Sequence, residues 1–373
     1  MNITFLIGNG FDLNLGMQTS YKDIYSRYIK TKSNTKNIEK FKDLLETEES
    51  CNFKTWSDFE MGMANHIDVF NSEDDFLECV RDFKRFLGQQ LLLEDDTCKS
   101  QLLSNTAFIN ACAKETKNSL ENFYIGQTPN IINFIDDFKE SHKQIGIHYN
   151  IISFNYTQIL DTLINDSKSY YKNSGPFLNN SLLHIHGSLD GAIVLGVDNV
   201  NQLQKAKFPI SQKTKRTFIK PEFNTEHNIA NLNKAKDMIK YSDIIYIYGM
   251  ALGESDSIWI KAIIAWLLVN PDHLLFYNFH PKPVFQKWED DVVLDVQDEK
   301  REELLNIIKH SIDDGIEIPL KQIQIPLTHN IFNYLECVKS AEIEERKKIK
   351  PMGSLKDKYS ENAITQFSKT SKI

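Results

Sequence analysis

The first twenty residues, MNITFLIGNGFDLNLGMQTS, constrain the fold of this chain more than any other stretch. The mostly apolar run Ile3–Ile7 predicts a buried strand, and Phe11–Leu13 predicts the start of a helix. Gly8-Asn9-Gly10 lies between them, so the segment predicts a strand, a glycine turn and a helix. Such a turn can bring backbone N–H groups against a phosphate, because glycine tolerates a positive φ and has no Cβ to obstruct a ligand. Leu13 stands where the dinucleotide fingerprint has its third glycine, so a tight turn without a ligand explains the same residues.

The composition is that of an ordinary globular protein, with 41% hydrophobic and 25% charged residues among 373. This length accommodates two or three domains, or one α/β core with a large insertion. The formal net charge of -8 argues against a general nucleic-acid-binding protein, because such proteins usually have a basic balance.

No segment predicts a membrane span or a targeting peptide. The longest apolar candidate, Ala262–Val269, is far shorter than the roughly 20 residues that a spanning helix needs. The five cysteines are scattered and form no C-x-x-C pair, which indicates reduced thiols in a cytoplasmic protein and argues against a cysteine-ligated zinc.

A long helical region follows the opening segment. A dehydrogenase-type Rossmann fold would return a second strand with an acidic residue about 20 residues beyond its glycines. This chain instead predicts a helix at Tyr21–Lys30 and then further helices, of which Trp56–Phe70 and Asp74–Leu93 have the clearest period. We interpret residues 36–137 as a helical insertion or cap, residues 1–35 and 138–350 as an α/β nucleotide-binding core, and residues 351–373 as a polar, mobile tail.

Strand patterns return after the helical region. Predicted strands lie at Ile147–Phe154, Ser181–His186, Ala192–Gly196, Asp243–Tyr248 and His273–Phe279, with an edge strand at Ile316–Ile325. Predicted helices lie at Thr157–Ile164, His227–Lys240, Glu254–Leu268, Lys300–His310 and His329–Lys347, whereas Asn201–Asn224 shows no period. Strands separated by helices predict an α/β, Rossmann-like fold, with a mainly parallel sheet and helices on both faces.

Unusual polar clusters follow the ends of the predicted strands. They are Gly8–Asp12, Asn155–Thr157, His186–Ser188, Gly249–Asp256 and Asn278–His280. In open parallel sheets, ligands bind beyond the carboxyl ends of the strands. The clusters therefore predict one shared site.

Several of these residues allow two interpretations. Asn155 either caps the following helix or holds a ribose hydroxyl or a water. His184 and His186 share one face of a strand, which is compatible with a metal pair. Alternatively, His186 at the strand tip is a general base or a satisfied structural histidine, and His184 is a buried, hydrogen-bonded residue.

The remaining candidates are also ambiguous. Gly249–Asp256 is either a tight turn with Ser255 as a helix cap or the second wall of a nucleotide site. Asn278 can hydrogen-bond a ribose. Trp56 and Glu60 lie one helical turn apart, and we interpret them as a core tryptophan and a surface acid.

Taken together, these segments resemble the AbiH family of bacterial abortive-infection proteins, which act in phage defence. The matching signatures are LIGNGFDLNLGMQTSY at the start, WSDFE at 56–60, SFNYT at 153–157, HIHGS at 184–188, LGVDN at 195–199 and IYGMALGESD at 247–256.

The same series resembles, more remotely, the sirtuin-like NAD-binding fold. Gly8–Asp12 resembles the sirtuin glycine-alanine-glycine turn, and Asn155 resembles the asparagine of the T-Q-N-I-D motif. His186 before Gly187 resembles the catalytic histidine, Gly249–Leu252 the G-T-S-L turn, and Asn278 the late strand-end asparagine. Asp12 replaces the usual serine and Thr157 the usual aspartate, and the four-cysteine zinc module of sirtuin deacylases is missing.

These resemblances imply an NAD-consuming hydrolase in phage defence that cleaves the nicotinamide–ribose bond. NAD is expected as substrate, with no metal, and with Asn155, His186 and Asp12 as catalytic residues. The expected binding residues are Gly8, Asn9, Gly10, Phe11, Asp12, Ser20, Tyr156, Gly249, Leu252, Asp256 and Asn278. The pyrophosphate is expected on the Gly8–Phe11 turn.

Such an activity requires restraint in healthy cells, so control by a homo-oligomeric state or by a phage-derived trigger is expected, with residues 36–137 as the candidate region. The alternatives are a nucleotide-binding sensor without catalysis, an NAD-dependent protein deacylase and a metal-dependent nuclease that uses His184 and His186.

Overall fold

The computed structural model of the chain describes residues 1–49, 55–103, 106–144, 146–170, 181–280, 289–312, 315–327 and 331–334. The predicted tail at 351–373 and most of the predicted helix at His329–Lys347 lie outside these residues. No helix in the described ranges is long and apolar enough to cross a membrane.

The centre of the molecule is a six-stranded sheet in which every strand pair is parallel. The strands are β1 (Asn2–Ile7), β2 (His148–Ser153), β3 (Ser181–His184), β4 (Ile244–Tyr248), β5 (Leu274–Tyr277) and β6 (Ile323–Gln324). Their order across the sheet is β3-β2-β1-β4-β5-β6, which is the order of dinucleotide-binding Rossmann folds. The direction of winding reverses between β1 and β4, and ligands bind at such a point, beyond the carboxyl ends of the strands.

The central strands are apolar on both faces because helices cover both. Phe5 of β1 pairs with Ile151 of β2 and with Tyr246 of β4, and these side chains pack on the face formed with α6 and α8. The next residue, Leu6, points to the opposite face, where it packs with helices α11 to α13. Continuous apolar strands of this kind are typical of parallel sheets, so the predicted α/β class is confirmed.

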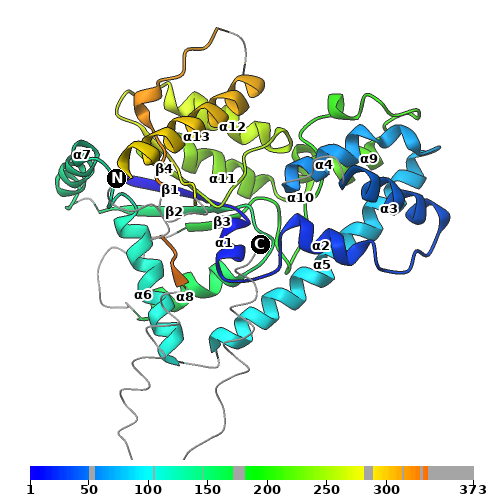
Figure 1. Ribbon diagram of the computed structural model, residues 1–373, viewed down its shortest axis with the longest axis horizontal. Coiled ribbons are helices and arrows are strands. Elements are labelled where there is room, and N and C mark those ends of the chain that lie inside the picture. The colour runs from blue at the N-terminus through cyan, green and yellow to red at the C-terminus, as the bar shows by residue number, and fades with distance from the viewer. Residues whose placement is uncertain are drawn as a thin grey trace, which may run out of the picture.

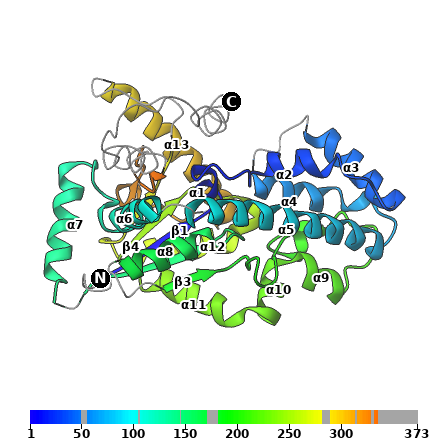
Figure 2. The same ribbon diagram turned by 90° about the horizontal axis from the view of Figure 1, so that it is seen from below.

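The helices form two layers, one on each face of the sheet, and a third group beyond the carboxyl ends of the strands (Figures 1 and 2). Their bounds are α1 (Gly10–Asn14), α2 (Tyr21–Tyr28), α3 (Lys36–Glu49), α4 (Trp56–Asn65), α5 (Glu73–Leu103), α6 (Thr106–Asn122), α7 (Pro129–Ser141), α8 (Ile159–Tyr170), α9 (Gln212–Phe218), α10 (Lys220–His227), α11 (Ile229–Lys240), α12 (Ser257–Leu267) and α13 (Asp290–Ser311). Short 3-10 helices are η1 (Ile67–Val69), η3 (Val200–Leu203), η4 (Glu254–Asp256) and η5 (Leu320–Gln322).

A helical body made of α2 to α5, α9 and α10 lies beyond the carboxyl ends of the strands (Figure 2). It has a hydrophobic core of its own. Local sequence explains where two of its helices begin. Ser20 with Asp23, and Thr55 with Asp58, form capping boxes that satisfy the first N–H groups of α2 and α4. Helices α6 and α7, in contrast, pack on the core that covers one face of the sheet.

Two strand predictions from the second half of the chain are wrong. Ala192–Gly196 is not a strand, because its buried side chains pack against the helical body and only Ile193 forms an isolated bridge, with Gly187. Asn201–Asn224, which shows no period in the sequence, contains most of η3, all of α9 and the start of α10, and these elements are too short to show one. The predicted edge strand at Ile316–Ile325 shrinks to Ile323–Gln324.

The two glycine turns, after β1 and after β4, pack backbone against backbone. Gly8 N donates to Tyr248 O at 2.9 Å, and Gly10 N donates to Gly249 O at 2.7 Å. A Cβ on Gly10 would lie 2.5 Å from the Cα of Gly249, which itself has φ +59°. The glycines are therefore required by the contact between the turns, which brings the β1 and β4 ends of the site together.

We expect Gly10→Ala to destabilise the protein by about 1–3 kcal/mol, because the added methyl group forces apart two backbones that cannot relax independently. Gly191→Ala is the matched control, since its Cβ meets only the Ser188 hydroxyl, at 3.9 Å. Urea unfolding of the two variants measures the difference. Equal midpoints would show that the contact between the turns is loose.

Candidate functional site

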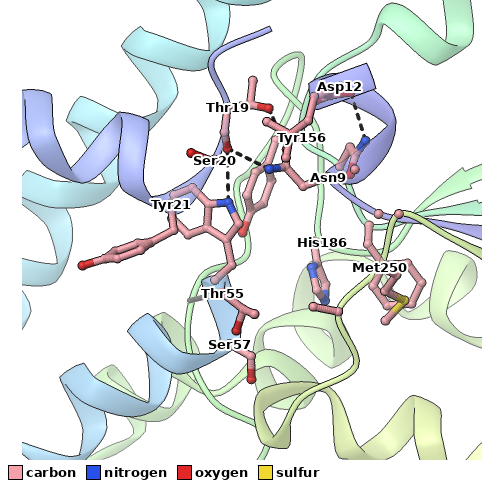
Figure 3. Close-up of a pocket in the computed structure, with 18 of the residues that line it drawn as sticks. Asn9, Asp12, Thr19, Ser20, Tyr21, Thr55, Ser57, Tyr156, His186 and Met250 are labelled. Atoms are coloured by element: carbon pink, nitrogen blue, oxygen red, sulfur yellow. Dashed lines mark hydrogen bonds between the residues drawn. The ribbon is translucent and has the colours of Figure 1, made fainter. Parts of the chain in front are cut away.

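A cavity opens where the carboxyl ends of β1, β2, β3 and β4 face the helical body (Figure 3). Its volume is ≈ 240 Å³. A single water molecule needs about 10–15 Å³ of cavity volume, so the cavity is large enough for a small-molecule ligand. In Figure 3, Asn9, Thr19 and Asp12 lie along one side, and Thr55 and Ser57 of the helical body lie across from them.

Most of the predicted site residues line this cavity together. They are Gly8, Asn9, Gly10, Asp12, Ser20, Asn155, Tyr156, His186, Gly249 and Asp256. Phe11, Leu252 and Asn278 are not among its lining residues. Phe11 packs instead against Phe332 and Tyr334, and Leu252 is buried with α12. Asn278 follows β5, and its amide nitrogen lies 3.4 Å from Pro326 O.

The polar groups of the opening turn are largely occupied. The N–H groups of Gly8 and Gly10 donate to carbonyls of the β4 turn, as described above. Asn9 and Thr19 bond reciprocally, with Asn9 Nδ2 at 2.9 Å from Thr19 O and Thr19 Oγ1 at 2.7 Å from Asn9 Oδ1. Ser20 is the N-cap of α2 and bonds to Asp23. These groups shape the wall of the cavity and leave little capacity to bind a phosphate at this turn.

Asp12 and Asn155 form a buried polar contact in the site. Asn155 Nδ2 donates to Asp12 Oδ1 at 3.0 Å, and Thr157 Oγ1 donates to Asp12 Oδ2 at 2.7 Å. Helix α8 begins only at Ile159, so Asn155 does not cap it. Its Oδ1 is buried and has no hydrogen-bond partner among the residues that the structure describes. An unpartnered buried carbonyl is costly, so this atom is available for a ligand hydroxyl or a water.

Burial raises the pKa of Asp12 to about 7, even though hydrogen bonds from Thr157 and Asn155 lower it. Asp12 therefore changes its charge close to physiological pH. In the described part of the chain, its carboxylate accepts hydrogen bonds from the neutral side chains of Asn155 and Thr157. Of the nearby charges, that of Asp95 raises the pKa further and that of His184 lowers it.

His184 supports the position of Asn155. Its Nδ1 lies 2.8 Å from Asn155 O and its Nε2 lies 2.9 Å from Asp161 Oδ2. Burial lowers the pKa of His184, but the hydrogen bond and the charge of Asp161 more than reverse this effect, so the net shift is upward. Both nitrogens are thus engaged, as expected for a hydrogen-bonded residue. No group of three or more His, Cys, Asp or Glu that could hold a metal lies within the described residues.

His186 stands next to a buried network of charges. Asp256 Oδ1 lies 3.1 Å from His186 Nε2, within ion-pair distance but not aligned as a hydrogen bond. The same oxygen lies 2.9 Å from Lys220 Nζ, and this ammonium lies 2.7 Å from Glu60 Oε2. Ser255 Oγ donates to Glu60 Oε2 at 2.6 Å, and Gly196 N donates to Glu60 Oε1 at 3.0 Å.

The charges in this network stabilise each other against burial. Burial lowers the pKa of Lys220, but Asp256 and Glu60 more than reverse this and raise it above its ordinary value. Burial raises the pKa of Asp256, yet Lys220 and His186 bring it below the ordinary value. Burial raises the pKa of Glu60, and Lys220 offsets this only in part. Lys220 is therefore held as a cation between two acids.

The sequence patterns do not predict that Glu60 and Lys220 belong to this network. Glu60 is not a surface acid, because its side chain is buried against Lys220 and lines the cavity. Trp56, predicted to lie in the core, is partly exposed and also lines the cavity, and its Nε1 donates to Thr19 O at 3.3 Å. Lys220 lies in the segment without a period and had no motif around it. Ser255, considered as a helix cap, bonds to Glu60 instead, and Asp256 is the residue that precedes α12.

We expect Asp12→Asn to stabilise the protein at pH 8. The folded state raises the pKa of Asp12 from 3.8 to about 7, so it binds the proton more tightly than the unfolded chain does. Stability is therefore lost as the pH rises from about 4 to 7, by roughly 1–4 kcal/mol in total. Thermal unfolding at pH 8 and pH 5 tests this: the variant should gain at pH 8, and the gain should shrink at pH 5.

We expect Lys220→Met to cost about 3–5 kcal/mol, because it leaves Glu60 and Asp256 buried without a counter-ion. Adding Glu60→Gln should recover part of this loss. Lys213→Met is the control, since it removes an exposed ion pair with Asp74 and should cost at most about 1 kcal/mol. Denaturant titration of the wild-type protein, the single variants Lys220→Met and Glu60→Gln, the double variant and the control measures the coupling. Additive effects of the two buried substitutions would contradict it.

Comparison with known proteins identifies the family. The family described as bacteriophage abortive infection AbiH matches residues 4–277, which run from β1 to the end of β5 and include every residue that lines the cavity. A search of curated proteins finds no significant match. The remoter sirtuin-like resemblance stays a prediction. Since the match spans well over half of the 373 residues, the chain belongs to the bacteriophage abortive infection AbiH family.

Proposed function

We propose that this abortive-infection protein hydrolyses NAD at the nicotinamide–ribose bond. The observation on which the proposal mainly rests is the unpartnered, buried Oδ1 of Asn155, in a cavity that also presents His186 and Asp12. The cavity lies where the winding of the sheet reverses, which is the usual position of a nucleotide in this class of fold.

In the proposed reaction, the bond between the nicotinamide nitrogen and ribose C1′ breaks and its electron pair leaves with nicotinamide, which becomes neutral. The transition state resembles an oxocarbenium ion, as in glycoside hydrolysis generally. A water oxygen forms the new bond to C1′. Asn155 Oδ1 accepts a hydrogen bond from a ribose hydroxyl or from this water.

His186 and Asp12 supply the proton transfer and the charge. Nε2 of His186 faces Asp256, which leaves Nδ1 to accept the proton of the attacking water. Asp256 stabilises the imidazolium that forms, as a carboxylate behind a catalytic histidine does. The ionised carboxylate of Asp12 stabilises the positive charge that develops on the ribose, and burial strengthens this interaction.

The direct test is release of nicotinamide from NAD by the purified protein. We expect His186→Ala and Asn155→Ala to lower the rate roughly 100- to 10,000-fold, the range typical of a lost general base or a lost positioning group. His310→Ala, on the exposed surface of α13, is the control and should keep the full rate. Circular dichroism verifies that each variant is folded. Release that is unaffected by His186→Ala would contradict the assigned roles.

A nucleotide-binding sensor without catalysis is the second candidate. The observation that favours it is the contact between His186 and the ion network, which gives this histidine a structural role. A phage infection assay separates the two candidates. A folded His186→Ala protein that still protects cells supports the sensor, and loss of protection together with loss of nicotinamide release supports the hydrolase.

A further inference from the structure

The charged side chains that line the cavity do not favour the binding of a phosphate, which is itself negatively charged. Among the lining residues that the structure describes, the acids are Asp12, Glu60 and Asp256, and the only Lys or Arg is Lys220. Lys220 already contacts both Glu60 and Asp256. A ligand phosphate placed beside Lys220 would therefore also lie close to an excess of carboxylates and be repelled by them.

The backbone of the opening turn does not reverse this preference. In phosphate-binding turns, free N–H groups point at the anion. Here the N–H groups of Gly8 and Gly10 donate to Tyr248 O and Gly249 O. The turn that sequence comparison favours as a phosphate cradle therefore has two of its donors engaged in the contact with the β4 turn.

Aromatic rings supply a further part of the wall. Tyr21, Trp56, Phe154 and Tyr156 all line the cavity. Tyr21 and Trp56 meet edge to face, with ring centroids 5.9 Å apart, on the side of the helical body. Phe154 and Tyr156 flank His186, with centroids at 5.2 and 6.4 Å from its ring, on the side of the sheet. Aromatic faces attract organic cations, and carboxylates beside them add to this attraction.

We propose that the cavity recognises its ligand as a planar organic cation, and that it holds the N-ribosylated pyridinium of an oxidised nicotinamide nucleotide while the phosphates lie outside it. The identity of this ligand rests on the proposed function. The aromatic walls and the acid excess by themselves specify the charge and shape of the bound group.

Asp12 is the carboxylate whose charge the ligand compensates. Both oxygens of Glu60 and one oxygen of Asp256 contact Lys220 or other donors of the network. Asp12, in contrast, receives hydrogen bonds from the neutral groups of Asn155 and Thr157. Oxidised and reduced nicotinamide rings have nearly the same shape, but only the oxidised ring is positively charged. Asp12 therefore selects the oxidised form.

The experiment uses carba-NAD, in which a methylene group replaces the ribose ring oxygen so that the pyridinium is retained without hydrolysis. Calorimetric titration of the whole protein compares oxidised carba-NAD, its reduced form and ADP-ribose. We expect the oxidised form to bind at least tenfold more tightly than the reduced form, and ADP-ribose, which has the phosphates but no pyridinium, to bind more weakly than the oxidised form.

The variant Asp12→Asn keeps the size of the side chain and removes its charge, so we expect it to reduce the preference for the oxidised form to threefold or less. Asp272→Asn, an exposed aspartate far from the cavity at the start of β5, is the control and should keep the full preference. Equal binding of the two forms by the wild-type protein, or tighter binding of ADP-ribose, would overturn the inference.

These outcomes are independent of the hydrolase test. If nicotinamide is released from NAD but both forms of carba-NAD bind equally, the proposed function stands and the cation inference fails. If the oxidised form is preferred but no nicotinamide is released, the cation inference stands and the hydrolase fails. Absence of binding by every probe would overturn the inference directly.

Discussion

The contact of one buried ammonium with two buried carboxylates governs how the parts of this protein fit together. Lys220 lies on α10, Glu60 on α4 of the helical body, and Asp256 in the turn that follows β4. A buried charge is tolerated only when it is paired, so the three segments have to dock at the same point. His186 lies beside the same Asp256, and the geometry of the candidate site therefore depends on the docking of the helical body against the sheet.

The contact between the glycine turns limits how the site can bind a ligand. Close approach of the β1 and β4 turns requires residues without a Cβ, and it engages the N–H groups of Gly8 and Gly10. The groups that remain available to a ligand are side chains: the amide of Asn155, the imidazole of His186, the carboxylate of Asp12 and the aromatic rings around them. The inference that the bound group is a cationic ring rests on these side chains.

Much of the fold could be predicted from local patterns. Apolar runs located β1, β2, β4 and β5, and the helical period located α4, α5 and α11, because each element is long enough or apolar enough to show its own period. The strand prediction at Ala192–Gly196 is wrong, since Ile193 and Leu195 pack against helices that lie far away in the sequence. Helices α9 and α10 were missed because each spans only two turns, and their stability comes from docking rather than from pattern.

Residue patterns alone predict that the polar groups of Gly8–Asp12, Asn155, His186 and Gly249–Asp256 follow strand ends, and hence that they meet at one edge of a parallel sheet. Which atoms are available there becomes visible only in the folded protein. The tertiary structure shows that the glycine N–H groups are engaged, that Asn155 Oδ1 is not, and that Glu60 and Lys220 belong to the site. The physical reason is that strand direction is a local property, whereas burial, pairing and the charge state of a side chain depend on segments that meet only in the folded chain.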